Sequence, residues 1–378
     1  MQGSRLIALV PAVLGLVALG CGNDGSDMPP VTPVGPEIHG LHVVSGHLED
    51  NTGTTVALRG VNRSGSEYMC VKGGTVFDGA WGLATIGAIA SWKANVVRVP
   101  LNEYCWLNAG TEGTTYRQAI LLFVSLLHQY HIVPILELHW AAPGTMVADE
   151  QQPMPDADHS VDFWKDVATT FAGDDGVVFE LYNEPYPDSD RDSDAGWQCW
   201  RDGCTATLWM GGKSTANTYQ AVGMADLVST IRTVAPNHLI LLGGLQYSNA
   251  LTQWMAYAPA DNNIAPAWHV YSFNSCKTEQ CWDAAPASLA ANFPLIVTEL
   301  GEDDCAGSFI EPFMQWLDGH GASYLAWSWN SGASCIPGRG TGSRPWPLVT
   351  DYLSGNPSGG YAQAFHDHLA AVVIPPAP

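Results

Sequence analysis

Two glutamate residues lie at the ends of apolar segments of strand length. Glu184 follows the segment 177–182, between an asparagine and a proline, and Glu299 lies near the end of the segment 295–300. Two carboxyl groups that face each other can divide the work of catalysis, because one can give and take a proton while the other attacks as a nucleophile. Glu184 and Glu299 are therefore the candidate catalytic pair.

Other polar and aromatic side chains follow the same kind of segment elsewhere in the chain. Each has an ordinary explanation on its own: a histidine can be a satisfied core residue, an arginine can pair with a surface acid, and an Asn-Glu-Pro run suits the start of a helix. Their joint placement at the ends of separate segments favours a shared site. The candidate supporting residues are Arg98, His139, Asn183, His269, Tyr271 and Trp327.

The elements that would position these residues alternate between strand and helix patterns. Near-continuous apolar strands are typical of a parallel sheet buried on both faces, and eight of them alternating with helices predict an α/β fold, a closed (β/α)8 barrel. The carboxyl ends of barrel strands share one face, where active sites lie. An open, doubly wound sheet is the alternative, but no glycine-rich phosphate loop follows the first strand. The predicted strands are 56–61, 95–99, 132–138, 177–182, 238–242, 267–271, 295–300 and 324–327, and the predicted helices include 116–130, 160–171 and 218–234.

The order of these residues is similar to that of a known family. Arg98 within Val-Arg-Val-Pro, His139, Asn-Glu-Pro, His-x-Tyr, the second glutamate and Trp327 follow one another along the chain. From about residue 39 to about residue 370 the chain resembles glycoside hydrolase family 5, which contains many cellulases and mannanases. The resemblance implies a retaining mechanism with Glu184 as acid/base and Glu299 as nucleophile. It also implies that Asn183 holds the sugar 2-hydroxyl and that Trp327 lies beneath the sugar next to the scissile bond.

The two carboxyl groups need different pKa values for these roles. We expect Arg98 to lie beside Glu299 and keep it ionised, and the charge of Glu299 to raise the pKa of Glu184. Three further side chains are expected to orient the carboxylates or to bind sugar hydroxyls: Tyr271, as a hydrogen-bond donor to Glu299, with His139 and His269.

The expected activity is that of a retaining endo-β-1,4-glycanase that needs no cofactor or metal. An endoglucanase (cellulase) is the first choice, and a β-mannanase or an exo-β-glucosidase the second. A non-catalytic carbohydrate-binding surface protein is the alternative from another class. The formal net charge of −22 repels phosphate backbones and argues against nucleic acid. The expected partner is a neutral polysaccharide or oligosaccharide, and the chain is expected to be a monomer.

The N-terminal region has the composition of an export signal followed by a tether. Arg5 precedes an apolar run, 6–20, that is too short for a typical membrane-spanning helix. The run before Cys21 resembles a bacterial lipoprotein signal, which implies lipidation of Cys21; an ordinary secretory signal is the alternative. We expect a signal at 1–21, a flexible linker at 22–37 and a catalytic domain at 38–372 that begins with a β-hairpin around Asp50-Asn51-Thr52-Gly53. The protein would then be secreted or anchored by lipid to the bacterial cell envelope, with no other membrane contact.

The cysteines fit an exported protein. Nine are present, and setting Cys21 aside leaves an even number that can pair by oxidation. Zinc is the rival explanation, but no histidine pair lies nearby in finger register. The predicted disulfides join neighbours in sequence: Cys70–Cys105, Cys199–Cys204, Cys276–Cys281 and Cys305–Cys335.

Other acidic residues and several tryptophans lie outside this set of candidate site residues. Glu137 is expected to be buried inside the barrel or structural. Glu67 is a candidate to line the cleft, and Glu302 and Asp303 are expected to be solvated or at the outer cleft. The alternating acids Asp188, Asp190, Asp192 and Asp194 form either a solvated loop or a calcium site, although they lack the glycine and closing glutamate of an EF-hand. Some tryptophans in predicted loops are expected to form outer sugar subsites: Trp140, Trp197, Trp200, Trp209 and Trp254.

Overall fold

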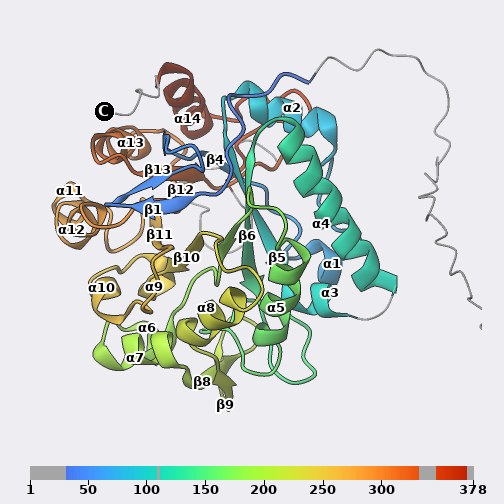
Figure 1. Ribbon diagram of the computed structural model, residues 1–378, viewed down its shortest axis with the longest axis vertical. Coiled ribbons are helices and arrows are strands. Elements are labelled where there is room, and N and C mark those ends of the chain that lie inside the picture. Colours follow the sequence, from blue (N-terminus) through green and yellow to red (C-terminus); the bar gives the residue numbers. More distant parts are fainter. Residues whose placement is uncertain (1–30, 109–110, 332–345, 373–378) are drawn as a thin grey trace, which may run out of the picture. The chain divides into compact units, whose positions relative to one another are not determined.

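The computed structural model describes residues 31–108, 111–331 and 346–372. Eight parallel strands close into a barrel in which each strand pairs with the next along the chain, and the last pairs with the first (Figure 1). The strands are almost wholly buried, as expected for a parallel sheet covered on both faces. The predicted closed barrel is therefore confirmed. Its strands are β4 (Arg59–Asn62), β5 (Val96–Asn102), β6 (Val133–Trp140), β7 (Val178–Glu180), β10 (Ile240–Gly243), β11 (Ile264–Tyr271), β12 (Ile296–Gly301) and β13 (Ser323–Ala326).

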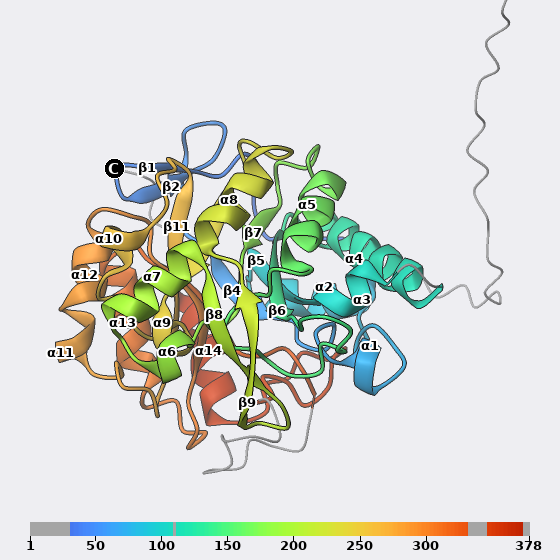
Figure 2. The same ribbon diagram turned by 90° about the horizontal axis from the view of Figure 1, so that it is seen from below.

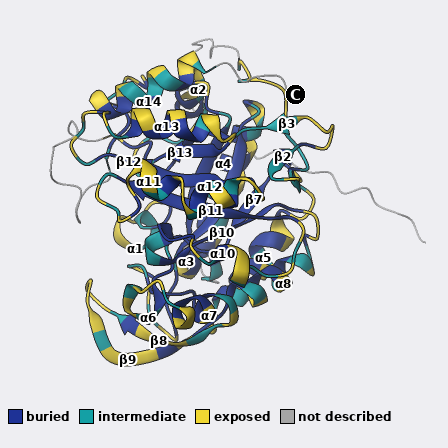
Figure 3. Ribbon diagram, turned by 90° about the vertical axis from the view of Figure 1, so that its left-hand side faces the viewer, coloured by how far each residue is buried: buried dark blue, intermediate teal, exposed yellow. Residues whose placement is uncertain are grey.

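Helices surround the barrel, and the longer ones bury one stripe each. In α4 (Thr111–Gln129), Ile120, Phe123, Val124 and Leu127 are buried at the spacing of one helix face. The same pattern of buried and exposed positions alternates along the outer helices in Figure 3. The other helices are α1 (Met69–Lys72), α2 (Leu83–Ser91), α3 (Glu103–Leu107), α5 (Ser160–Thr170), α6 (Pro187–Asp190), α7 (Asp194–Asp202), α8 (Met224–Arg232), α9 (Leu245–Ser248), α10 (Trp254–Tyr257), α11 (Glu279–Trp282), α12 (Ala285–Ala290), α13 (Ile310–Gly319) and α14 (Gly360–Ala371).

A small antiparallel sheet precedes the barrel where a hairpin was predicted. It has three strands, β1 (His42–Val44), β2 (His47–Glu49) and β3 (Thr55–Val56). The predicted turn connects β2 to β3, and the carboxylate of Asp50 closes it by accepting hydrogen bonds from the backbone of Thr52 and Thr54. The predicted hairpin is thus part of a slightly larger sheet.

A second hairpin lies inside the insertion after β7, and its last residues overlap the start of the helix predicted at 218–234. Residues from 218 onward form the end of β9 (Ser214–Ala221), which pairs with β8 (Cys204–Trp209), and the helix α8 begins only at Met224. Tyr219 and Ala221 are buried while their neighbours are exposed, which is the two-residue period of a strand. Figure 2 shows the hairpin extending past the barrel strands.

Three of the four predicted disulfides are formed: Cys70–Cys105, Cys199–Cys204 and Cys276–Cys281. Cys305 is also disulfide-bonded, but its predicted partner, Cys335, lies outside the described residues.

The predicted signal and Cys21 lie outside the described residues as well, so these remain predictions. The described end of the predicted linker contacts the barrel, because the Val34 backbone N–H donates to the carbonyl of Tyr130 at 3.1 Å. In the part of the chain that the structure describes, no helix has both the length and the apolar character needed to cross a bilayer.

Candidate active site

The eight residues singled out from the sequence come from six strands and meet at the carboxyl ends of the barrel. Each contacts at least one other through a hydrogen bond or a ring contact. The strands fix their positions: β11 and β12 pair in parallel with His269 opposite Glu299. The residues are Arg98 on β5, His139 on β6, Asn183 and Glu184 after β7, His269 and Tyr271 on β11, Glu299 on β12 and Trp327 after β13.

The two candidate catalytic carboxylates both approach the same nitrogen of His269. Its Nδ1 is 3.0 Å from Oε1 of Glu184 and 3.6 Å from Oε2 of Glu299. One ligand atom from each of these three residues lies within 4.8 Å of the other two. The carboxyl groups are thus close enough to act on the two atoms of one bond in a bound molecule.

Glu299 is held by two donors and is almost fully buried. Arg98 donates from Nη1 to Oε1 at 2.7 Å, and the Tyr271 hydroxyl donates to Oε2 at 2.5 Å. Burial raises the pKa of Glu299, while Arg98 and the Tyr271 hydrogen bond oppose this rise. The expected contact with Arg98 is present, but its effect is to limit the rise in pKa and not to lower it below the usual value.

No arginine or lysine among the described residues pairs with Glu184. Desolvation is the largest cause that raises its pKa far above the usual value, and the charge of Glu299 is the second. The sequence had named only the second cause. Since Glu299 has Arg98 and Tyr271 as donors and Glu184 does not, Glu184 is the carboxyl group that keeps a proton to the higher pH.

A chain of hydrogen bonds fixes the direction of the bond between His269 and Glu184. The Thr298 hydroxyl donates to Oε1 of Glu180 at 2.9 Å, so its oxygen is left to accept from Nε2 of His269, at 3.1 Å. Burial lowers the pKa of His269 far below its usual value, so the ring is neutral and carries one proton. With that proton on Nε2, Nδ1 is an acceptor and the bond to Glu184 is donated by a protonated carboxyl group.

His139 and Asn183 occupy the other side of the mouth. Nδ1 of His139 lies 2.9 Å from Glu137, which is fully buried as expected, and burial lowers the pKa of His139 to about 4. The His139 ring is stacked on Trp327, with 5.5 Å between ring centroids. Asn183 accepts from Arg98 at 2.9 Å, so the guanidinium group orients its amide.

A family model described as Cellulase (glycosyl hydrolase family 5) matches residues 50–333. The chain belongs to this family.

The relatives of this chain include a mannosidase and an endoglucanase. It is 24% identical over 298 residues to a mannan endo-1,4-beta-mannosidase from Streptomyces lividans, covering 77% of this chain and 66% of the relative. It is 23% identical over 335 residues to endoglucanase E-5 from Thermobifida fusca, covering 83% of this chain and 61% of the relative. The chain therefore spans less than two thirds of the length of these relatives.

Solved structures of low identity share the fold. A β-glucanase from Saccharophagus degradans has a TM-score of 0.65 and 20% identity, covering 92% of this chain and 99% of that one. The catalytic domain of the Thermobifida fusca endoglucanase has a TM-score of 0.60 and 18% identity, covering 88% and 97%.

The family-5 chain also contains site residues that its sequence did not point to. Glu180 is buried at the end of β7 and accepts from Nε of Arg98 at 2.6 Å. Gln151 accepts from the Asn183 amide at 2.7 Å and donates to the carbonyl of Glu184 at 2.6 Å. A charged residue within an apolar strand is a signal that could have identified Glu180, whereas Gln151 lies in a loop without a recognisable pattern.

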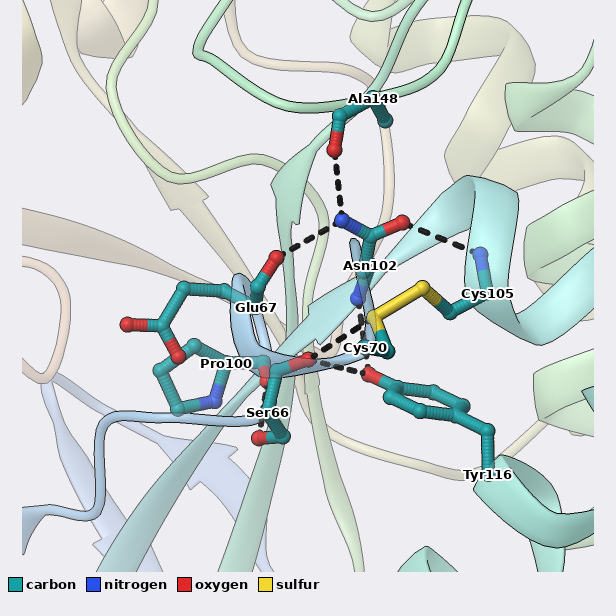
Figure 4. Close-up of a disulfide and its surroundings, with 8 residues drawn as sticks. All are labelled: Ser66, Glu67, Cys70, Pro100, Asn102, Cys105, Tyr116 and Ala148. Carbon is teal, nitrogen blue, oxygen red and sulfur yellow. Dashed lines mark hydrogen bonds between the residues drawn. A yellow bond between two sulfur atoms is a disulfide. The ribbon is translucent and has the colours of Figure 1, made fainter. Parts of the chain in front are cut away.

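Glu67 lies in the loop after β4, beside the disulfide Cys70–Cys105 (Figure 4). The Asn102 amide donates to the carbonyl of Glu67 at 2.7 Å, and the carboxyl group points away from the disulfide. Burial raises the pKa of Glu67 to about 7, and the interaction with His139 opposes the rise. Glu67 therefore sits within electrostatic range of the site, in a loop that the disulfide ties to α3.

Two of the remaining acids are held by protein contacts. Glu302 was expected to be solvated or at the outer cleft but is fully buried, and its carboxylate accepts from the backbone of Phe309 and Ile310 at the start of α13. Asp188 pairs with Arg191 at 2.5 Å.

Two groups of possible metal ligands occur among the described residues. One is the site itself, and the other is Glu103, Asp156 and His159. In this second group Glu103 accepts from Ser160 at 2.5 Å, and Asp156 accepts from the backbone of His159 at 2.9 Å. The alternating acids between Asp188 and Asp194, which extend from α6 to the start of α7, contribute to neither group.

Of the five tryptophans among which some outer sugar subsites were expected, three are too buried to contact a sugar. Trp197, Trp200 and Trp254 are fully buried, and the indole N–H of each donates to a protein oxygen. They fill the space between α7, α10 and the barrel, where apolar burial outweighs any gain from exposure. Trp140 and Trp209 remain partly exposed.

Proposed function

We propose that this chain hydrolyses a β-glycosidic bond by double displacement, with retention of configuration. The observation that carries the proposal is the close approach of Glu184 and Glu299. One carboxylate oxygen from each lies within 4.8 Å of the other and of a ring nitrogen of His269. Retaining glycosidases place their two carboxyl groups about 5–5.5 Å apart, whereas inverting ones leave about 6.5–9.5 Å for a water molecule.

Each residue then has a role that follows from its contacts. Glu299 attacks the anomeric carbon while the proton of Glu184 passes to the leaving oxygen, and a covalent glycosyl–enzyme forms. Glu184 next takes a proton from water, and the water oxygen displaces Glu299. Arg98 and Tyr271 hold the attacking carboxylate in place through the bonds at 2.7 and 2.5 Å. Asn183 would bind the sugar 2-hydroxyl, and Trp327 would lie beneath the ring.

A neutral β-1,4-glycan is the proposed substrate, cut within the chain. Glucan is the first choice, supported by the endoglucanase relative and by the Saccharophagus degradans β-glucanase, which was solved in complex with cellotetraose. Mannan is a second candidate, because the Streptomyces lividans relative is a mannosidase. Export through a signal at 1–21, with Cys21 lipidated, remains part of the proposal, as do the domain limits 38–372 and a monomeric state.

The experiment is a hydrolysis screen on cellulose, mixed β-glucan, mannan and xylan, with Glu299→Gln as the inactive control. We expect turnover of a β-glucan or mannan by the wild type only. Proton NMR of the first product formed should show the β-anomer; an initial α-anomer would contradict the retaining mechanism. Binding of these glycans without turnover would instead favour a non-catalytic binding protein.

A further inference from the structure

A cluster of two buried carboxyl groups and one histidine lies outside the candidate active site. Glu103 is the first residue of α3, while Asp156 and His159 belong to the loop between β6 and α5. One ligand atom from each of the three lies within 4.8 Å of the other two. Only 2% of Glu103 and 1% of Asp156 are exposed, and no arginine or lysine among the described residues pairs with either. Two buried carboxyl groups so close together need a positive ion or a shared proton between them.

The hydrogen-bond donors around these carboxyl groups are too few for the acceptors. The Ser160 hydroxyl has one proton, and its oxygen lies 2.5 Å from Oε2 of Glu103 but 3.4 Å from Oδ2 of Asp156. The proton therefore goes to Glu103. Oδ1 of Asp156 accepts from the backbone of Asp158 and His159, at 3.0 and 2.9 Å. Oδ2 of Asp156 is thus a buried oxygen left without a donor, which a bound cation would satisfy.

Nδ1 of His159 faces three oxygen atoms at once. It lies 3.2 Å from Oδ1 of Asp156, 3.2 Å from the carbonyl oxygen of Ala142 and 3.9 Å from Oε1 of Glu103. A single N–H cannot donate a well-aligned hydrogen bond to all three, whereas an ion bound to the nitrogen can contact several oxygens together. With metal–ligand bonds of about 2.0–2.1 Å, the ligand atoms of a tetrahedral site are about 3.3 Å apart, which is close to these distances.

A cavity of about 230 Å³ adjoins the cluster, and its lining includes Glu103, Ala142 and His159. It offers an ion a path to the ligands and room for a water molecule as a further ligand. An imidazole nitrogen combined with carboxylate oxygens suits Zn²⁺ or Mn²⁺, whereas Ca²⁺ and Mg²⁺ prefer oxygen ligands alone.

We propose that Glu103, Asp156 and His159 bind one divalent transition-metal ion, which joins α3 to the loop between β6 and α5. The role of the ion is structural, because the candidate catalytic carboxylates form a separate group. The same loop carries Gln151, which donates to the carbonyl of Glu184 at 2.6 Å. The ion therefore also steadies a segment that contacts the candidate active site, although the site itself does not depend on the proposed hydrolysis.

The test is isothermal titration calorimetry of Zn²⁺, Mn²⁺ and Ca²⁺ into the full chain, after treatment with EDTA and removal of the chelator. We expect one site per chain for Zn²⁺ or Mn²⁺. His159→Gln and Glu103→Gln should each weaken binding by at least about tenfold, the loss that even an outer-shell partner of a metal causes. His47→Gln, which changes a histidine paired with Glu49 elsewhere in the fold, is the matched control and should bind as the wild type does.

A second control separates the two groups of possible ligands. Glu299→Gln alters the candidate active site and should keep the ion, because its ligands lie in the other group. Loss of the ion in Glu299→Gln together with its retention in His159→Gln would place the ion in the active site and overturn the proposal. A wild type that binds neither Zn²⁺ nor Mn²⁺ would overturn it as well, and would indicate that the two carboxyl groups share a proton.

Thermal unfolding checks that the variants lose the ion and not the fold. Zn²⁺ at about a hundredfold excess over its Kd should raise the Tm of the wild type by about 4 °C and leave that of His159→Gln unchanged. In EDTA the Tm of Glu103→Gln should be no lower than that of the wild type, since the substitution removes one of two buried charges that repel each other. An equal rise in Tm with Zn²⁺ in the wild type and in both ligand variants would contradict the assigned ligands.

Discussion

Thr298 links the buried Glu180 to the candidate acid Glu184 through His269. Its hydroxyl donates to Glu180 and accepts from the ring, so it favours the form of neutral His269 whose Nδ1 accepts a hydrogen bond from protonated Glu184. Thr298→Val removes the hydroxyl at nearly constant volume. His269 can then carry its proton on Nδ1 and donate to an ionised Glu184, which lowers the pKa of that carboxyl group.

The magnitude follows from the single hydrogen bond that selects the form of the ring. A neutral hydrogen bond is worth about 1 kcal/mol. Since 1.36 kcal/mol corresponds to one pKa unit, the pKa of Glu184 should fall by about 0.7 in the variant. A carboxyl group that acts as the acid is active below its pKa, so kcat/KM is lost as the pH rises through that value. The alkaline limb of the variant should therefore lie at lower pH than that of the wild type.

The assay is kcat/KM against pH on a phenyl β-glycoside of the glycan that is hydrolysed, because a poor leaving group needs the proton of Glu184. The 2,4-dinitrophenyl glycoside needs little acid assistance and should show a much smaller shift. Thr298→Ser keeps the hydroxyl and is the matched control. An unchanged alkaline limb in Thr298→Val would refute the direction of the hydrogen bonds, and an equal shift in Thr298→Ser would indicate a packing effect instead.

Two further predictions follow from contacts in the same region. Tyr271→Phe removes the 2.5 Å hydrogen bond to Glu299, so the pKa of Glu299 should rise and the acidic limb of kcat/KM should move to higher pH. A hydrogen bond to a charged group is worth about 1.5–3 kcal/mol, so kcat/KM should also fall about tenfold to a hundredfold at its optimum; a change below twofold would contradict the assigned contact. The double variant Cys70→Ser/Cys105→Ser opens a loop of 35 residues and should lower the free energy of unfolding by about 3–4 kcal/mol. The matched variant Cys199→Ser/Cys204→Ser opens a loop of 5 and should cost about 2 kcal/mol, as urea denaturation followed by tryptophan fluorescence can test; the reverse order would contradict the loop-entropy argument.

The candidate site was predictable because the barrel constrains where its residues lie. Once strands are recognised by their apolar runs, topology alone brings their carboxyl ends to one face, so Arg98, Glu184 and Glu299 can be placed together before any contact is known. Glu180 was not identified although it lies in a recognised strand. It precedes the end of the apolar run, where a single charge does not interrupt the pattern, and its role depends on a partner 82 residues earlier in the chain.

The insertion after β7 behaved differently, because no topological rule governs it. The stretch 218–234 combines the end of a strand with a helix, and the helical spacing of Met224, Leu227, Val228 and Ile231 outweighs the two alternating positions, Tyr219 and Ala221, that mark the strand. The pairing of β9 with β8 decides between them, and it depends on backbone hydrogen bonds that no local pattern encodes. The buried tryptophans of α7 were misjudged for the same reason, since their exposure depends on how the insertion packs. The residues of the candidate site can therefore be predicted from the sequence of this chain, whereas the packing of the insertion after β7 depends on contacts that only the folded structure contains.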